Sequence, residues 1–476
     1  MGRQRTSRSR GSFNRRDFLK SAATVGAIGA AALAAPRILR AANKGDVIRL
    51  GLIGGGTEGY VLSNSVLKCR LAENVTFQAV CDIWPHHRNY LADVLGKYHM
   101  RPGRYADYGD MLDREKGKLD AVIVATPDWV HHEHAIACME AGLDVYCEKE
   151  MSNSIDNARK MVQASKRTGR LLQIGHQRRS NPRYKTLYDY VVNRKVCGRL
   201  THVSGNWNRD KPLTVIGEPK FDLDAATLRR YGYESMQHLC NWRWYRRYSG
   251  GPMADLGSHQ VDILNWILGR PPRSVMASGG RDNYPEMEWW DNIIAVYEWD
   301  QEDAGAKHTV RGNYDLYSTT SNGGYQEVFM GTEGAATISE DASKGGFLRE
   351  CTAPLSEWDL EMRKRMDLEA EELRKRAIAE GKTPPEDKAS GLFAEEWRPP
   401  RREYPPIPVP KDFKTEHQPH LENFFRAIRG AEKLTCPAEV GFETAVTILK
   451  VDQAITAERK LPFRPEEFNA CPAGPA

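Results

Sequence analysis

Short hydrophobic runs alternate with amphipathic stretches along the first third of the chain. Apolar runs at residues 47–53, 75–82 and 120–126 are typical of buried parallel strands. Further predicted elements are helices from about residue 57 to 71 and over 85–95, 131–141 and 154–168, and strands over 144–147 and 171–175. Strict alternation of this kind predicts an α/β fold, a doubly wound parallel sheet of the Rossmann type over residues 43–178.

After about residue 180 the pattern becomes that of an α+β domain with an open, largely antiparallel sheet. Predicted strands cover residues 200–207, 274–279, 293–298, 307–316 and 325–330, and predicted helices cover 184–192, 255–268 and 439–459. We assign this second domain to residues 179–470. Within it, residues 340–412 are interpreted as an insertion, because a helix of mixed charge is followed by proline-rich segments.

The first 42 residues resemble a twin-arginine (Tat) export signal. Arg15 and Arg16 precede Phe18 and Leu19, and an Ala/Gly-rich run covers residues 21–35. We therefore expect export to the periplasm through the Tat machinery, which carries proteins that are already folded. A basic tail followed by a membrane anchor is the alternative interpretation.

Charge and cysteine content narrow the class of protein further. Residues 1–42 contain nine basic residues and one acidic residue, a net +8, so the total of +5 leaves −3 for the rest of the chain. A slightly acidic body gives no reason to expect a nucleic-acid partner. The nine cysteines show no paired spacing, which favours buried thiols over disulfides or a zinc site.

A glycine turn follows the first predicted strand and opens the first helix. It reads Gly-Gly-Gly-Thr-Glu-Gly, and Gly54, Gly56 and Gly59 supply a G-x-G-x-x-G pattern. In this context the pattern predicts a dinucleotide whose pyrophosphate rests at the helix N-terminus. Asp82, at the end of the second strand, can bind ribose hydroxyls and repels a 2′-phosphate, which favours NAD. Arg88 nearby keeps NADP compatible with the sequence.

Three more segments complete a resemblance to the Gfo/Idh/MocA family, which includes glucose–fructose oxidoreductase and inositol dehydrogenase. Residues 125–131 read Ala-Thr-Pro-Asp-Trp-Val-His, residues 142–149 read Gly-Leu-Asp-Val-Tyr-Cys-Glu-Lys, and residues 255–262 read Asp-Leu-Gly-Ser-His-Gln-Val-Asp. The resemblance covers about residues 46–335 and 413–465. It identifies no particular substrate.

The resemblance implies roles for individual residues. It makes Lys149 the catalytic lysine and makes Asp255 and His259 the other catalytic pair. The positions that it places near the cofactor, the nicotinamide or the substrate are Thr126, His131, Glu148, His176 and Gln177.

The types and positions of these residues also fit alcohol oxidation, independently of the family resemblance. Oxidation of a secondary alcohol needs a base for the hydroxyl proton, and Lys149 or His259 can supply it. Asp255, His259 and Asp262 share one face of the predicted helix. An N-cap role for Asp255 and an interior role for His259 are the alternatives. We expect Arg179 and Asp262 to contact substrate.

Two local features limit the interpretation. The histidines at residues 131–134 do not form H-E-x-x-H, so we predict no metal site. The family proline after the catalytic lysine is Glu150 here, which removes a backbone constraint and adds a negative charge beside Lys149. Catalysis is therefore less firmly predicted than cofactor binding.

Together these features predict an exported NAD(P)-dependent oxidoreductase that acts on a sugar, polyol or sugar derivative. Because free NAD is scarce outside the cytoplasm, we expect a tightly bound cofactor that is regenerated on the protein. The alternatives are an NAD-dependent glycosidase that oxidises its substrate transiently, or a catalytically weak sugar-binding or scaffold protein. The resemblance also implies a homodimer or homotetramer.

Overall fold

The computed structural model describes residues 46–303, 305–382, 401–413 and 415–471. The predicted export signal at residues 1–42 lies outside these residues, so export stays a prediction. Within the described residues, no helix combines the length and the apolar character needed to cross a bilayer. All nine cysteines are free thiols and six of them are buried, as the spacing predicted.

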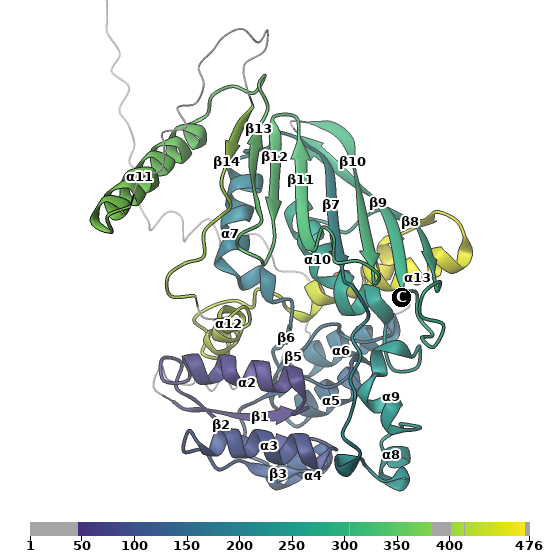
Figure 1. Ribbon diagram of the computed structural model, residues 1–476. Helices are drawn as coiled ribbons and strands as arrows, with labels where there is room; N and C mark the ends of the chain where they lie inside the picture. The colour runs from purple at the N-terminus through teal and green to yellow at the C-terminus, as the bar shows by residue number, and fades with distance from the viewer. Residues whose placement is uncertain (1–45, 304, 383–400, 414, 472–476) are drawn as a thin grey trace, which may run out of the picture. The chain divides into compact units, whose positions relative to one another are not determined.

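The N-terminal domain is a six-stranded parallel sheet in the order β3-β2-β1-β4-β5-β6, with helices on both faces (Figure 1). Its strands are β1 (Ile48–Ile53), β2 (Val75–Cys81), β3 (Gly103–Tyr105), β4 (Ala121–Val124), β5 (Asp144–Cys147) and β6 (Leu172–Ile174). Its helices are α2 (Thr57–Cys69), α3 (Pro85–Gly96), α4 (Tyr108–Arg114), α5 (Asp128–Glu140) and α6 (Ile155–Thr168). The predicted Rossmann fold is confirmed. The chain reverses its winding between β1 and β4, where such sheets bind their ligands.

The C-terminal domain is a nine-stranded sheet in the order β14-β13-β12-β11-β7-β10-β9-β8-β15. Every neighbouring pair is antiparallel except β7 and β10, which are parallel. Its strands are β7 (Leu200–Asn208), β8 (Ser274–Gly280), β9 (Asn292–Asp303), β10 (Ala306–Tyr317), β11 (Tyr325–Gly331), β12 (Gly334–Ile338), β13 (Gly345–Arg349), β14 (Arg402–Tyr404) and β15 (Leu461–Pro462). The predicted α+β architecture with a largely antiparallel sheet is confirmed.

The segment 340–412 is not wholly separate from this sheet. Its ends form β13 and β14, which extend the sheet at one edge, and α11 (Glu357–Ala379) connects to β13. Phe347 of β13 packs edge-on against Trp358 of α11, so the first turns of the charged helix are held to the sheet. Strands of three to five residues are too short to show a clear alternation of apolar and polar positions.

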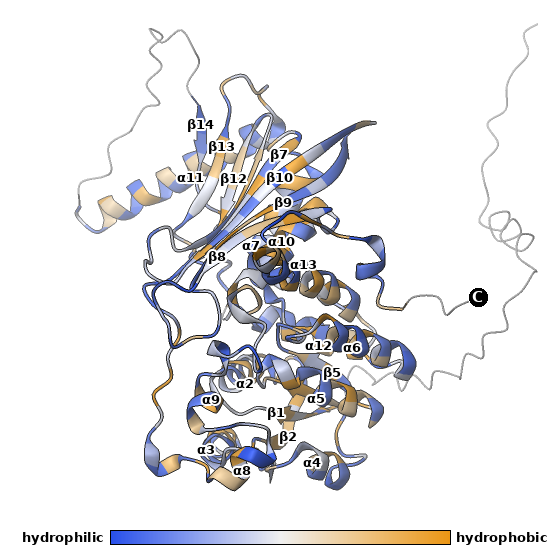
Figure 2. Cartoon of the chain, turned by 90° about the vertical axis from the view of Figure 1, so that its right-hand side faces the viewer, coloured by the Kyte–Doolittle hydropathy of each residue, from blue (hydrophilic) through white to orange (hydrophobic). Residues whose placement is uncertain are grey.

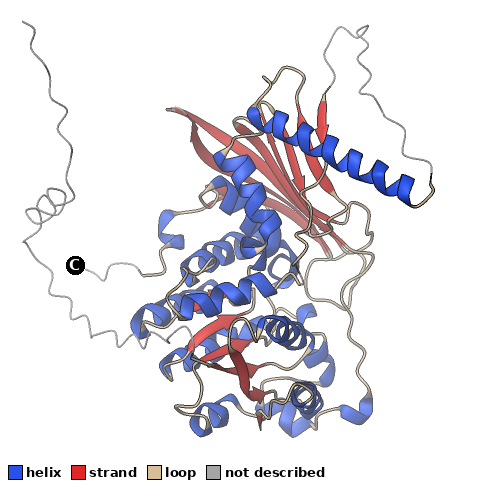
Figure 3. Ribbon diagram, turned by 90° about the vertical axis from the view of Figure 1, so that its left-hand side faces the viewer, coloured by secondary structure: helices blue, strands red, loops and turns tan. Residues whose placement is uncertain are grey.

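Three helices of the C-terminal domain lie on the face of the large sheet that is turned toward the N-terminal domain (Figure 3). They are α7 (Pro182–Tyr188), α10 (Ser258–Leu268) and α13 (Ala438–Ala457), whereas α12 (Gln418–Ile428) packs against α2 of the N-terminal domain. Short turns are η1 (Gln177–Ser180), η2 (Asp189–Asn193), η3 (Pro219–Phe221), α8 (Ala225–Arg230), α9 (Met236–Cys240), η4 (Trp242–Trp244), η5 (Met253–Gly257) and η6 (Pro465–Phe468). On β9, Ile293 and Ala295 are buried while Ile294 and Val296 are exposed. The face of the sheet that these helices do not cover therefore carries solvent-exposed apolar side chains.

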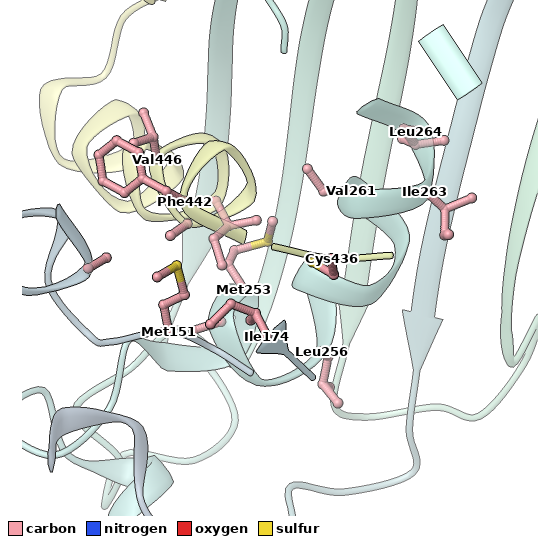
Figure 4. Close-up of a cluster of buried hydrophobic side chains, with 14 of the residues drawn as sticks. Met151, Ile174, Met253, Leu256, Val261, Ile263, Leu264, Cys436, Phe442 and Val446 are labelled. Atoms are coloured by element: carbon pink, nitrogen blue, oxygen red, sulfur yellow. The ribbon is translucent and has the colours of Figure 1, made fainter. Parts of the chain in front are cut away.

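A continuous hydrophobic core joins the two domains (Figure 4). Met151 and Ile174 of the N-terminal domain pack in it with Met253 of η5 and Phe442 of α13. A Cβ added at Gly441 would lie 2.6 Å from Ile174, so α13 approaches β6 closely. This packing fixes η5 next to the loop that follows β5, and so brings Asp255 near Lys149.

Candidate active site

The glycine turn between β1 and α2 has the geometry of a phosphate cradle. Gly54 has φ +98°, and a Cβ there would lie 2.5 Å from the Ala125 carbonyl oxygen. At Gly59 a Cβ would lie 1.9 Å from the Gly54 carbonyl oxygen. Gly56 differs, since only the His87 ring comes within 4 Å of its missing side chain. The backbone of the turn therefore requires glycine at Gly54 and Gly59. Gly56 instead leaves open space at the N-terminus of α2.

Asp82 lies at the end of β2, beside this turn. Its carboxylate accepts hydrogen bonds from the backbone N–H groups of Gly55, at 2.7 Å, and Trp84, at 2.7 Å. The Arg88 guanidinium donates to the carbonyl oxygen of Asp82 at 2.8 Å. The Asp82 carboxylate thus lies where the sequence predicts a contact with the adenosine ribose. The glycine turn and this carboxylate fit an NAD molecule, and they are the residues that would hold its pyrophosphate and adenosine ribose.

A cavity of about 850 Å³ extends from the glycine turn to η5. Gly54, Gly56 and Asp82 line one part of it, and Lys149 and Asp255 line another. The other walls come from residues 126–134, from residues 213–221 and from residues 230–243. The structure therefore opens the predicted cofactor residues and the predicted catalytic lysine onto one space.

His131 connects the loops after β4 and β5. Its Nε2 lies 2.6 Å from the Thr126 carbonyl oxygen and its Nδ1 lies 2.7 Å from the Glu150 carbonyl oxygen. Burial lowers the pKa of His131 to about 4. The Thr126 hydroxyl lies 3.1 Å from Nδ1 of His134, a second histidine of α5. His131 is buried and thus positions the loop of Lys149, while Thr126 lines the cavity.

Glu148 is buried directly before the lysine. Its carboxylate accepts hydrogen bonds from the Tyr146 hydroxyl, at 3.2 Å, and from the backbone N–H of Lys149, at 3.1 Å. Burial, together with the nearby Glu58 carboxylate, raises the pKa of Glu148 to about 8. A Cβ at Gly175 would lie 2.7 Å from this carboxylate. Gly175 is therefore needed for the position of Glu148, and the sequence marked it only as the end of a strand.

Glu58, Glu148 and His417 bring ligand-type atoms within 4.8 Å of one another. His417 Nε2 lies 3.4 Å from the Glu58 carboxylate, a contact that joins the start of α12 to the first turn of α2. An acidic pair with one histidine does not by itself make a metal site. The absence of a resident metal stays a prediction.

Lys149 reaches across the domain junction to Asp255. Its Nζ donates to the Asp255 carbonyl oxygen at 2.5 Å and lies 3.9 Å from the carboxylate. The Arg243 guanidinium donates to the same carboxylate at 2.9 Å, and Arg209 lies 3.9 Å from it. Burial opposes the charge of Asp255, but Arg243 and Lys149 outweigh burial and hold its pKa well below the ordinary range. Asp255 is therefore an ionised residue that orients the lysine.

Asp255 lies in η5, a π-helical turn, and α10 begins only at Ser258. The expected helix over residues 255–268 therefore starts three residues later as a regular α-helix. The alternative N-cap role for Asp255 is wrong, because helical backbone already begins at Gly251 and continues through η5 into α10, so Asp255 lies inside the helical segment. Turns of this kind are frequent at functional sites, since they redirect one side chain without ending the helix.

His259 and His176 are buried close to the lysine. The His259 ring lies 5.5 Å from the Trp207 ring, centroid to centroid, at the end of β7. Burial, and then the charge of Lys149, keep the pKa of His259 well below its ordinary value. Among the described residues, Nδ1 of His259 and both ring nitrogens of His176 find no hydrogen-bond partner. Neutral imidazoles with unused nitrogens are suited to accept a proton or a hydrogen bond from a bound hydroxyl.

Gln177 shares this property, because its buried Oε1 is also without a partner among the described residues. Burial lowers the pKa of His176 to about 4, so this histidine is neutral at physiological pH. The prediction that residues 176 and 177 contact nicotinamide or substrate is compatible with these unused atoms and stays a prediction.

Arg179 and Asp262, the expected substrate contacts, form hydrogen bonds with each other. Arg179 Nε donates to both carboxylate oxygens of Asp262, at 3.0 and 2.8 Å, and the Thr444 hydroxyl donates at 2.9 Å. Neither residue lines the cavity. Burial alone would raise the pKa of Asp262, but Arg179 outweighs it and lowers the pKa. The expected substrate contacts thus form an internal ion pair that ties η1 to α10 and α13.

Glu150, which replaces the family proline, is buried. Its Oε1 accepts a hydrogen bond from the Met151 backbone N–H at 2.7 Å, and its peptide bond with Lys149 is cis. Burial raises the pKa of Glu150 to about 8. The side chain is therefore mostly neutral at pH 7, and the negative charge expected beside Lys149 is largely suppressed.

Sequence comparisons relate both halves of the chain to one group of oxidoreductases. Residues 48–176 match GFO_IDH_MocA, an oxidoreductase family with an NAD-binding Rossmann fold, and residues 190–337 match a GFO/IDH/MocA C-terminal domain. Rhizopine catabolism protein MocA of Rhizobium meliloti is 27% identical over 237 residues, which are 50% of this chain and 62% of that protein. Myo-inositol 2-dehydrogenase of Thermotoga maritima is 25% identical over 232 residues, 49% of this chain and 58% of that protein. The chain spans about a third to three fifths of the length of the first curated relatives.

Solved structures show the same fold over most of the chain. A levoglucosan dehydrogenase in complex with NADH and levoglucosan has a TM-score of 0.62 and 16% identity, covering 88% of this chain and 99% of that one. The WlbA dehydrogenase from Bordetella pertussis, in complex with NADH and UDP-GlcNAcA, has a TM-score of 0.59 and 18% identity, with coverage of 88% and 99%. At this level of identity the likeness establishes the fold.

Proposed function

Because the chain belongs to the GFO/IDH/MocA family of oxidoreductases with an NAD-binding Rossmann fold, we propose that it oxidises a CH–OH group of a sugar, polyol or sugar derivative with NAD. One observation carries the proposal. The glycine turn, Asp82 and Lys149 all open onto one cavity, which is large enough for a dinucleotide and the reacting part of a substrate.

The bound nicotinamide supplies the hydride acceptor. Gly56 and the N-terminus of α2 would receive the pyrophosphate, and the Asp82 carboxylate would accept hydrogen bonds from ribose hydroxyls. A 2′-phosphate would place negative charge beside that carboxylate, whose oxygens already accept two backbone hydrogen bonds. The cofactor is therefore NAD in preference to NADP.

The chain's own residues handle the proton of the substrate hydroxyl. His259 does not itself line the cavity, but it is neutral because it is buried and lies near Lys149, and its Nδ1, which has no partner among the described residues, can accept that proton. Lys149 can donate a hydrogen bond to the oxygen as negative charge develops there. Asp255 does not need to touch substrate, since its carbonyl oxygen and its carboxylate orient the lysine. Lys149 remains the second candidate for the base.

Export, which residues 1–42 predict, adds a condition. A dehydrogenase outside the cytoplasm finds little free NAD, so the cofactor is loaded before export, stays bound and is regenerated on the protein. Regeneration takes one of two forms: a second substrate is reduced, or the same substrate takes the hydride back after elimination and hydration. In the second case the net reaction is hydrolysis of a glycoside.

The exposed face of the large sheet is the surface through which we expect two copies to associate. Met276, Ile294, Val296 and Met330 lie exposed on β8, β9 and β11. Replacing Ile294 with Glu should convert a dimer or tetramer into a smaller species in light scattering. A wild-type protein that is monomeric at all concentrations would overturn this part of the proposal.

The test starts with mature protein isolated from the periplasm without added cofactor. Denaturation should release a near-stoichiometric dinucleotide, which enzymatic assay identifies as NAD or NADH. Native protein is then mixed with polyols and glycosides, and NADH absorbance and released sugar are followed, with Lys149→Met as the control. NADH that accumulates indicates net oxidation, and transient NADH with a released sugar indicates net hydrolysis. Protein that neither carries nor binds a dinucleotide would refute the proposal.

A further inference from the structure

We propose that residues 213–221 form a strap that covers the bound dinucleotide, with Phe221 beside its adenosine half, and slows its release. The inference rests on the proposed function, since it names the residues that retain the cofactor. The strap belongs to the long connection after β7, which runs to α8 (Figure 2). Six residues of this segment line the same cavity as Gly56 and Asp82: Leu213, Val215, Ile216, Gly217, Glu218 and Phe221.

One end of the strap is tied to the C-terminal domain. The Val215 N–H donates to Oδ1 of Asn241 at 2.7 Å, and Nδ2 of Asn241 donates back to the Val215 carbonyl oxygen at 3.0 Å. The Trp244 indole N–H donates to the Leu213 carbonyl oxygen at 3.0 Å. Asn241 is 3% exposed, so this two-point attachment is shielded from water.

The other end is tied to the N-terminal domain at the turn after β2. The Trp84 indole N–H donates to the Phe221 carbonyl oxygen at 2.5 Å. The Phe221 ring stacks on His86 with centroids 3.9 Å apart and an angle of 22° between the planes. The strap therefore crosses from one domain to the other and is held at both ends.

The Trp84 anchor places the Phe221 end of the strap at the adenosine end of the cavity, whereas the Asn241 anchor lies two residues from Arg243, which bonds the Asp255 carboxylate. The backbone N–H of Trp84 donates to the carboxylate of Asp82, the expected ribose contact, and the indole N–H of Trp84 donates to Phe221. Trp84 therefore holds Phe221 close to the expected ribose site. Lys149 and Asp255 belong to the part of the cavity formed with η5. Phe221 thus borders the part of the dinucleotide that does no chemistry, and the strap extends from there along the cavity toward Arg243 and Asp255.

The apolar side chains of the strap suit the flat rings of a dinucleotide. Leu213, Val215 and Ile216 are 48%, 41% and 90% exposed although they line a cavity. When a flat group covers apolar side chains at the edge of a cavity, their surface is removed from water, and this stabilises the bound group. A dinucleotide enclosed in this way leaves only after the strap detaches from Asn241 or from Trp84.

The experiment compares release of NADH from three full-length proteins: wild type, Asn241→Ala and Asn423→Ala. Asn423 is a matched control, because it is also 3% exposed and also bonds a loop backbone, accepting from Thr435 and donating to Lys433, but it lies outside the cavity. Release is followed by NADH fluorescence after mixing with excess NAD. Loss of two shielded hydrogen bonds should raise the release rate of Asn241→Ala roughly tenfold or more. Asn423→Ala should release NADH at the wild-type rate.

A second variant guards against misfolding of the first. Trp84→Phe keeps an aromatic ring and removes only the indole N–H bond to Phe221, and it should also release NADH several-fold faster. Folded variants of both kinds that release NADH at the wild-type rate would overturn the strap. Wild-type protein that binds no NADH would instead refute the proposed function, so the two failures are distinguishable.

Discussion

Replacing Asp262 with Asn tests whether Arg179 and Asp262 form an internal ion pair or contact substrate. The carboxylate receives two donors, Arg179 Nε and the Thr444 hydroxyl, and is 1% exposed. Hydrogen bonds to a charged group contribute about 1.5–3 kcal/mol each, and loss of one partner of a buried ion pair costs about 3–5 kcal/mol. We therefore expect Asp262→Asn to lower the free energy of unfolding by about 3–5 kcal/mol.

Urea unfolding followed by tryptophan fluorescence measures this loss, and a double-mutant cycle assigns it. Arg179→Met alone should destabilise by a similar amount, whereas Arg179→Met with Asp262→Asn should be less destabilised than the two single losses added together, because no buried charge is left alone. Arg273→Met is the control: Arg273 pairs with Glu298 at the surface, so its loss should cost below about 1 kcal/mol. Singles that keep wild-type stability but raise KM for the substrate would refute the reasoning and restore the substrate contact.

Three further outcomes follow from the site. Gly175→Ala should weaken NADH binding in a fluorescence titration, because the new Cβ would lie 2.7 Å from the Glu148 carboxylate; unchanged affinity would contradict the tight packing. Lys149→Met should lower kcat by about 10²–10⁴-fold in single-turnover assays while dinucleotide content is kept; loss of the dinucleotide instead would assign the lysine to binding. The pKa of Glu150 is raised from its ordinary 4.5 to about 8. Wild type should therefore lose stability as pH rises from 4.5 to 8, since the unfolded chain releases that proton first, and Glu150→Gln should lose less in thermal melts across this range. An identical pH slope in the two proteins would argue against a buried neutral carboxyl.

Sequence and structure agree most closely where local pattern determines structure. The strands β1, β2 and β5 begin or end within one residue of the predicted runs, because parallel strands buried on both faces are continuously apolar. The glycine turn was predictable too, since the positive φ of Gly54 and the close approach at Gly59 exclude other residues. The short elements β3, β13 and β14 escaped prediction, because three to five residues carry too little periodicity.

Other features depend on contacts between distant segments. Nothing near residue 262 indicates that Asp262 would meet Arg179 rather than a substrate, because the pair forms only when α10 packs on η1. The suppressed charge of Glu150 likewise depends on its burial in the folded chain. No motif marks residues 213–221, whose attachment at Asn241 and Trp84 joins parts of the chain far apart in sequence.

By itself the sequence determined the Rossmann domain, the dinucleotide turn and the residues able to take a proton, because each needs particular residue types at fixed spacing. The tertiary structure alone decided which of those residues face the cavity and which face one another. The physical reason is that burial and the nearest opposite charge set the ionisation of a side chain. Both are properties of the packed chain: Asp255 stays charged between Arg243 and Lys149, while Glu150 is held mostly neutral by its surroundings.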